Sequence, residues 1–171
     1  MNNQKTRMLV EGGIMIALGY VLSNIKVFEM PNGGSITAVS MLPAIIYAIR
    51  WGVKPGLFVA GVYGLLQFLL GPKYSGHIVS ILCDYVLGFG VLGLSGFLGK
   101  DYVKSLIASV ITMLARFVLA VISGIVVYQV DFVGSVVYNA TYMIPEIILT
   151  VVVFTLVFKP LQKFNASIAA R

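Results

Sequence analysis

The sequence predicts an all-α, polytopic membrane protein that folds as a compact bundle of six transmembrane helices. Hydrophobic residues make up 59% of the 171 positions and charged residues only 11%, and the mean hydropathy is +0.98. This balance lies far outside that of water-soluble domains. A spanning helix needs about 20 mostly apolar residues, and polar or Gly- and Pro-containing segments separate six such stretches. The helices are predicted at residues 8–27, 36–50, 55–71, 78–98, 104–128 and 136–158.

The first two stretches have distinctive borders. Residues 1–7 are polar and basic, and the apolar stretch after them lacks a small-residue cleavage site, so we expect a retained helix. The second stretch is the shortest, and the turn-forming segment 30–35 before it is a candidate lid that could dip into the membrane. The sequence shows no internal repeat or soluble second unit, so residues 1–171 are predicted to form one substrate-binding domain.

The positive residues predict the orientation. If six helices alternate across the bilayer, nine cations lie on the side of both termini, two lie opposite, and Arg116 lies within a helix. The positive-inside rule then places both termini in the cytoplasm. The outer loops fall near residues 31–35, 71–77 and 129–135, where Gly, Tyr and polar residues suit a binding mouth for a ligand from outside. The nine cations are Lys5, Arg7, Arg50, Lys54, Lys100, Lys104, Lys159, Lys163 and Arg171.

Several function classes lack the residues that they need. The cations are dispersed in short connecting segments, which argues against nucleic acid as a partner. The sequence has no phosphate-binding loop motif, zinc-protease motif or nucleophile-elbow motif. Cys83 is the single cysteine and His77 the single histidine. An enzyme, a metal site and a bound cofactor are therefore not expected.

Asp84 is the first candidate binding residue because an ionisable side chain at membrane depth is costly and usually functional. Tyr85 follows it, and Tyr74 and His77 precede the same predicted helix. A carboxylate beside aromatic faces can receive an organic cation by charge pairing and cation–π attraction. The alternative is a structural aspartate whose hydrogen bonds are satisfied by neighbouring helices.

Two further charges lie near the middle of the last two predicted helices. Arg116 and Glu146 are predicted to form an ion pair that makes both tolerable in lipid. Helical spacing places each on a stripe with further candidates. Gly124 leaves room for a ligand or, alternatively, permits close helix packing. The stripes are Arg116, Ala120, Gly124 and Tyr128 on one helix, and Asn139, Tyr142 and Glu146 on the other.

The first predicted helix carries a small-xxx-small pair, Gly13 and Ala17, that would let another helix approach closely. The pair is a candidate docking site for a partner protein. The chain is also shorter than most autonomous secondary transporters, which commonly combine two related halves. Active transport would therefore need partner subunits.

Five segments together resemble the substrate-binding S components of energy-coupling-factor (ECF) vitamin transporters, and among them the thiamine-specific ThiT type. The resemblance implies a subunit in a bacterial cell membrane that captures thiamine, a cationic heterocycle, from outside. It also implies docking on a transmembrane coupling protein driven by two ATPase subunits. The segments are residues 9–18, 28–35, 84–90, 116–124 and 138–146.

The resemblance assigns roles to individual residues. The acid and aromatic of the family's site match Asp84 and Tyr85, its loop tyrosine matches Tyr74, and its amide matches Asn139. Its Ala-x-x-x-Ala coupling motif corresponds to Gly13 and Ala17. Three family residues differ, since a histidine falls at Ala120, a tryptophan is replaced by Tyr128, and the first outer loop has no tryptophan, Trp51 being the single one. A thiamine precursor or another small vitamin therefore remains an alternative ligand, and a structural membrane protein remains an alternative function.

Overall fold

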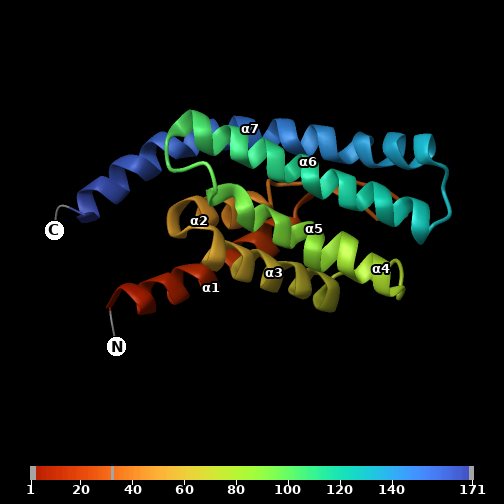
Figure 1. The fold of residues 1–171 in the computed structure, drawn as a ribbon, viewed down its shortest axis with the longest axis horizontal. Helices are drawn as coiled ribbons and strands as arrows, with labels where there is room; N and C mark the ends of the chain where they lie inside the picture. The colour runs from red at the N-terminus through yellow and green to blue at the C-terminus, as the bar shows by residue number, and fades with distance from the viewer. Residues whose placement is uncertain (1–2, 32, 170–171) are drawn as a thin grey trace.

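The computed structural model describes residues 3–31 and 33–169, with side chains described up to Phe158 and at Pro160. It is a bundle of helices in which the chain starts and ends at the same end (Figure 1). Arg171, one of the nine cations used to predict orientation, lies outside the described residues. The helical elements are α1 (Asn3–Asn24), α2 (Leu42–Trp51), α3 (Val53–Leu70), α4 (Ile78–Ser80), η1 (Ile81–Val86), α5 (Leu87–Gly90), η2 (Val91–Gly96), α6 (Tyr102–Val126) and α7 (Phe132–Ala169).

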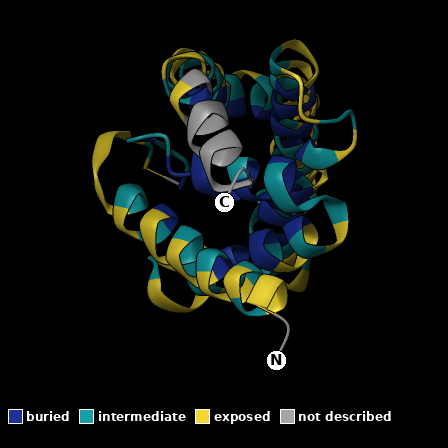
Figure 2. Cartoon of the chain, turned by 90° about the vertical axis from the view of Figure 1, so that its left-hand side faces the viewer, coloured by how far each residue is buried: buried dark blue, intermediate teal, exposed yellow. Residues whose placement is uncertain are grey.

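Five of the six predicted crossings are long and apolar enough to span a membrane in the described part of the chain. They are α1, α3, the continuous run from α4 to η2, α6 and the described part of α7. The remaining one, α2, is an apolar helix of only 10 residues. Large apolar side chains cover much of the outer surface, as expected where lipid is the solvent, and buried residues line the inside (Figure 2).

The second predicted helix, residues 36–50, is wrong over its first part. Ser35–Thr37 form strand β2, which pairs antiparallel with strand β1 (Lys26–Glu29). Val39 then has a φ of 54°, which is incompatible with a right-handed helix and is rare for a β-branched residue. The helix begins only at Leu42, with a proline in its first turn. The chain is therefore predominantly helical rather than all-α, with a β-hairpin between α1 and α2.

The fourth crossing is not a uniform helix. It begins as α4, widens into the π-helical segment η1, returns to α-helix in α5 and tightens into the 3₁₀ segment η2. π-Turns inside helices occur frequently at functional sites. The wide segment contains Asp84 and Tyr85, two of the candidate binding residues.

Close packing of the helices depends on residues without side chains. Gly56 of α3 lies against Gly93 of η2, so that a Cβ atom on Gly56 would lie only 2.6 Å from the Gly93 carbonyl oxygen and the Ala48 Cβ. Gly12 and Gly19 are the buried residues of α1, and they face Tyr47, Val59 and Tyr63. Small residues at such positions let membrane helices approach closely, which increases their van der Waals contact.

We expect Gly56→Ala to destabilise the bundle, because the added methyl group overlaps backbone that has no room to move. Overpacking of this kind costs about 1–3 kcal/mol. Gly61→Ala, on the same helix, is the matched control, since a Cβ there meets nothing within 4 Å. Thermal unfolding of both variants in detergent would test this. Equal melting temperatures for the two variants would contradict the proposed packing.

Candidate ligand-binding cavity

A cavity of ≈ 300 Å³ lies at the end of the bundle opposite the termini. Its size is at the lower end of the range for small-molecule sites. The β-hairpin, the loop after α3, η1, α5, α6 and α7 all contribute to its walls. Eight of the nine residues predicted to bind substrate line it, and so does Glu146. They are Tyr74, Asp84, Tyr85, Arg116, Gly124, Tyr128, Asn139 and Tyr142.

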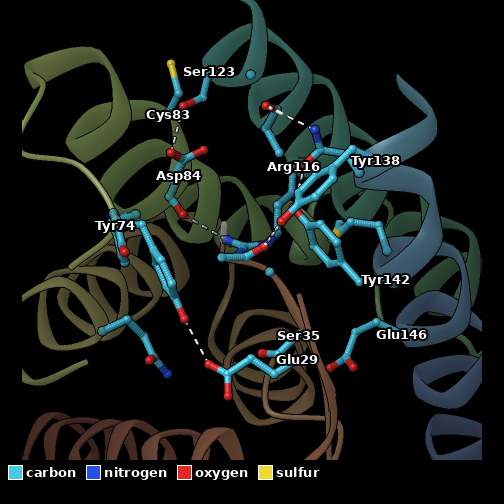
Figure 3. Close-up of a pocket in the computed structure, with 18 of the residues that line it drawn as sticks. Glu29, Ser35, Tyr74, Cys83, Asp84, Arg116, Ser123, Tyr138, Tyr142 and Glu146 are labelled. Atoms are coloured by element: carbon cyan, nitrogen blue, oxygen red, sulfur yellow. Dashed lines mark hydrogen bonds between the residues drawn. The ribbon is translucent and has the colours of Figure 1, made fainter. Parts of the chain in front are cut away.

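Asp84 is held by two hydroxyl groups. Ser80, one turn earlier, donates to its Oδ2 atom at 2.5 Å. Ser123 of α6 donates to the same atom at 2.7 Å (Figure 3). The other carboxylate oxygen accepts no hydrogen bond from the residues that the structure describes. A carboxylate can accept about four hydrogen bonds, so Asp84 keeps capacity for a ligand in the cavity. Neighbouring Cys83 and Tyr85 also line it.

Arg116 of α6 also lines the cavity, beside the segment that carries Asp84. Its guanidinium carbon lies 3.6 Å from the centroid of the Phe89 ring, a cation–π geometry that substitutes in part for water. Its Nη1 atom lies 3.5 Å from the backbone oxygen of Asp84, at the limit of a hydrogen bond. Its buried Nε atom has no hydrogen-bond partner. Arg116 therefore sits near the Asp84 segment rather than in a close ion pair.

The predicted Arg116–Glu146 ion pair is not formed. Glu146, only 1% exposed, instead accepts two hydrogen bonds of 2.7 Å from Thr37, one from the backbone N–H and one from Oγ1. Among the described residues, the ion pairs join Glu11 to Arg50, Lys26 to Glu29 and Asp101 to Lys104. The charge on Glu146 is satisfied by the hairpin, a partner that spacing along the helices could not reveal.

Asn139 and Tyr142 form a second preorganised group. The Tyr142 hydroxyl donates to Oδ1 of Asn139 at 2.5 Å, and Nδ2 of Asn139 donates to the backbone oxygen of Ser135 at 2.9 Å. The amide is therefore fixed in orientation before any ligand arrives. Gly124 of α6 faces Ser135, and a Cβ atom on Gly124 would collide with the Ser135 hydroxyl. This supports the packing explanation for Gly124, although the residue also lines the cavity.

The hairpin tip is enclosed by aromatic rings. Gly33 and Gly34 have φ values of +93° and +88°, which L-amino acids with side chains rarely adopt. A Cβ atom would lie 2.9 Å from the Tyr74 ring at Gly33 and 2.5 Å from the Tyr142 ring at Gly34. Tyr138 donates to the backbone oxygen of Gly33 at 2.9 Å. The rings therefore pack directly against the backbone of Gly33 and Gly34, and both glycines line the cavity.

Glu29 fastens the hairpin to the loop after α3. Its Oε1 atom accepts hydrogen bonds from Lys26 at 2.5 Å and from Tyr74 at 2.8 Å, and these contacts hold the pKa of its carboxyl group below the ordinary value. Desolvation, together with the Glu29 hydrogen bond, raises the pKa of Tyr74 to about 12. Glu29 therefore stays an acceptor, and Tyr74 a donor, over the whole neutral pH range.

The lining charges favour a cation. The cavity is lined by three carboxylates, those of Glu29, Asp84 and Glu146, and by two cations, Lys26 and Arg116, which gives a formal charge of −1. Since charges inside a low-dielectric site act more strongly than in water, this excess disfavours an anion.

Two groups of predicted residues lie away from the cavity. His77 caps the start of α4, where its Nδ1 atom accepts from the backbone N–H of Val79 at 3.2 Å, and it does not line the cavity. Gly13 and Ala17 lie on the exposed side of α1, and a Cβ atom on Gly13 would meet nothing within 4 Å. This face is free for a partner, as docking would require.

Sequence reasoning marked residues 30–35 as a candidate lid but named no individual hairpin residue as a binding residue, and it missed Tyr138. Tyr138 could have been found, because Tyr138, Tyr142 and Glu146 recur every fourth residue and form one stripe. All three contact the hairpin in the structure. Ser123 gave no comparable signal, since a serine in a membrane helix often only hydrogen-bonds its own backbone.

Comparisons with known proteins agree with this architecture. Residues 9–166 match the family described as "Thiamine transporter protein". Thiamine transporter ThiT of Bacillus subtilis is 33% identical over 172 residues, spanning 88% of this chain and 89% of that protein. A solved structure of ThiT from Listeria monocytogenes has a TM-score of 0.79 and 24% identity, covering 94% of this chain and 98% of its own.

A second solved structure, the S component for biotin from an ECF-type ABC transporter, has a TM-score of 0.67 at 19% identity. It covers 91% of this chain and 93% of its own. At this identity the likeness concerns the fold alone, so the family assignment depends on the sequence matches over most of the chain. The chain is a multi-pass membrane protein that belongs to the thiamine transporter family, and this confirms the family predicted from its sequence.

Proposed function

We propose that this protein is the thiamine-binding S component of an ECF-type uptake transporter in a bacterial cell membrane, with both termini in the cytoplasm. The observation that supports this most is the cavity itself, which combines a net negative lining with a carboxylate beside aromatic rings. Thiamine carries a permanent positive charge on its thiazolium ring and an aminopyrimidine that can form hydrogen bonds. Both features have a complement among the lining residues.

In this proposal, Asp84 faces the cationic ring and Tyr85 and Tyr128 provide flat surfaces against the ligand. Cation–π attraction adds to the charge pairing when the ring is shielded from water. The fixed amide of Asn139 is the candidate partner for the aminopyrimidine. Because Ser80 and Ser123 already orient the Asp84 carboxylate, little side-chain entropy remains to be lost on binding.

A related heterocycle is the second candidate ligand. Ala120 lines the cavity at the position where the resemblance places a histidine, so one polar contact to thiamine is absent on α6. If that contact is needed for thiamine, the cavity would bind a thiamine precursor or another small vitamin in place of thiamine. Mass spectrometry of the ligand that remains after mild detergent purification would distinguish the two candidates, and a structural protein would retain none.

We expect Asp84→Asn to weaken thiamine binding by about 10-fold or more, because a neutral amide cannot replace a charge-assisted contact worth ~1.5–3 kcal/mol. Asp131→Asn is the matched control, since Asp131 lies at the same end of the bundle but caps α7 and does not line the cavity. Calorimetric titration of the purified variants with thiamine is the measurement. Unchanged affinity in a folded Asp84→Asn protein would remove Asp84 from the site.

We expect Tyr74→Phe to increase the dissociation rate of the ligand by about two- to fivefold, the effect of one modest hydrogen bond. The phenylalanine keeps the ring against Gly33 but cannot donate to Glu29. Stopped-flow fluorescence would measure the rate. An unchanged rate would show that this contact does not hold the hairpin over the cavity.

The same contact predicts a pH dependence. A carboxyl group with a lowered pKa contributes above its ordinary value of 4.5, and its contribution is lost as the pH falls through the lowered value. The ratio of the dissociation rate of Glu29→Gln to that of the wild type should therefore be constant from about pH 9 to 5 and fall toward one below 4.5. Comparison with Glu29→Gln separates this step from the titration of Asp84, which both proteins share. Identical pH profiles would contradict the role of Glu29.

The docking face of α1 gives a further test. Replacing Gly13 or Ala17 with leucine should block close approach of the proposed coupling protein and abolish most thiamine uptake, while thiamine affinity remains unchanged. Val118→Phe, on the exposed side of α6, is the control for added bulk at a lipid-facing position. Uptake assays in cells and binding assays on purified protein are both needed. Loss of binding together with uptake would place this face inside the ligand site.

A further inference from the structure

Two side-chain amides line the ligand cavity, those of Gln67 and Asn139, and the protein uses them differently. The oxygen of Asn139 already accepts from the Tyr142 hydroxyl at 2.5 Å. Gln67, near the end of α3, instead uses its nitrogen, since Nε2 donates to the Tyr63 hydroxyl at 2.8 Å. Its Oε1 atom accepts no hydrogen bond from the part of the chain that the structure describes. An amide oxygen has two acceptor positions, so both remain for a ligand.

Tyr63, one turn before Gln67 on α3, fixes the orientation of this amide. Tyr63 is only 1% exposed, and its hydroxyl donates its single hydrogen to the backbone oxygen of Gly19 at 3.3 Å. The hydroxyl can then only accept from Gln67, so the NH₂ group of the amide must face it. The ring also packs closely on α1, where a Cβ atom on Gly19 would lie 3.2 Å from it. The free oxygen of Gln67 is therefore held in one orientation.

We propose that Gln67 is a specificity-determining residue, whose Oε1 atom accepts a hydrogen bond from the exocyclic amine of the ligand. This inference rests on the proposed function and narrows it to heterocycles that carry an N–H donor on the ring. The amine is uncharged at neutral pH, so a neutral amide oxygen suits it, while the Asp84 carboxylate serves the cationic ring. A ligand with a carbonyl oxygen at that position would leave the Gln67 oxygen facing another acceptor, which a partly buried site disfavours.

Titration of the purified full chain with thiamine and with oxythiamine, in which an oxo group replaces the exocyclic amine, tests this. The measured quantity is the ratio of the two dissociation constants, because a change that only disturbs packing weakens both ligands alike. We expect the wild type to prefer thiamine by about tenfold or more. Gln67→Met keeps the length of the side chain but has no amide oxygen, and it should lower the ratio by about two- to tenfold. Gln67→Glu keeps an acceptor oxygen and should retain the preference.

Tyr63→Phe is a second variant, which leaves the Gln67 oxygen in place but releases the amide, so the ratio should fall there as well. Gln129→Met is the matched control, since Gln129 is an exposed residue at the same end of the bundle and does not line the cavity. A wild-type ratio in Gln67→Met or in Tyr63→Phe, or an equal loss in Gln129→Met, would overturn this inference and leave the proposed function standing. A wild type that binds neither compound would overturn both.

Discussion

The hydrogen bonds between Glu146 and Thr37 hold the cavity together. A carboxylate that is 1% exposed inside a membrane bundle must be satisfied by the protein. Its two partners come from one residue of β2, so the same contacts that solvate the charge also fix the hairpin to α7. Once β2 is fixed there, the tip can lie between the rings of Tyr74 and Tyr142. The part of the cavity wall that the hairpin forms therefore depends on the buried carboxylate of Glu146, which fixes β2 to α7.

Two further polar groups of the cavity, those of Asp84 and Asn139, are also held in orientation by the protein. Asp84 receives two hydroxyl groups, and Asn139 is held between Ser135 and the Tyr142 hydroxyl. Such contacts lower the entropy that binding must remove and leave only selected atoms available to a ligand. The π-helical segment η1 contributes in the same way, since it widens the helix where Asp84 and its two neighbours line the cavity.

Hydropathy and spacing predicted most of the helices, and eight of the nine residues predicted to bind substrate line the cavity, because both features are local to one segment. They could not predict contacts between distant segments. The carboxylate of Glu146 finds Thr37, which is 109 positions away in the chain, whereas charge counting pointed to Arg116. Residues 36 and 37 were assigned to the start of a helix and residue 35 to the turn before it, and only pairing with β1 makes the three a strand. His77 was predicted to bind substrate because it is an aromatic residue in the loop after α3. In the structure its ring accepts the capping hydrogen bond from Val79, and it does not line the cavity.

α1 connects the proposed docking face, Gly13 and Ala17, with the hairpin of the cavity, although the two lie apart. Gly12 and Gly19 seat the helix against the bundle, and Gly13 and Ala17 point outward. At its end, a single residue, Ile25, leads from α1 into the hairpin that covers the cavity. A partner on α1 could therefore change ligand affinity through the hairpin, through the packed face of the helix, or through Ser23 near its end, which lines the cavity. The size of that change is limited by how much better the partner binds one hairpin position than another.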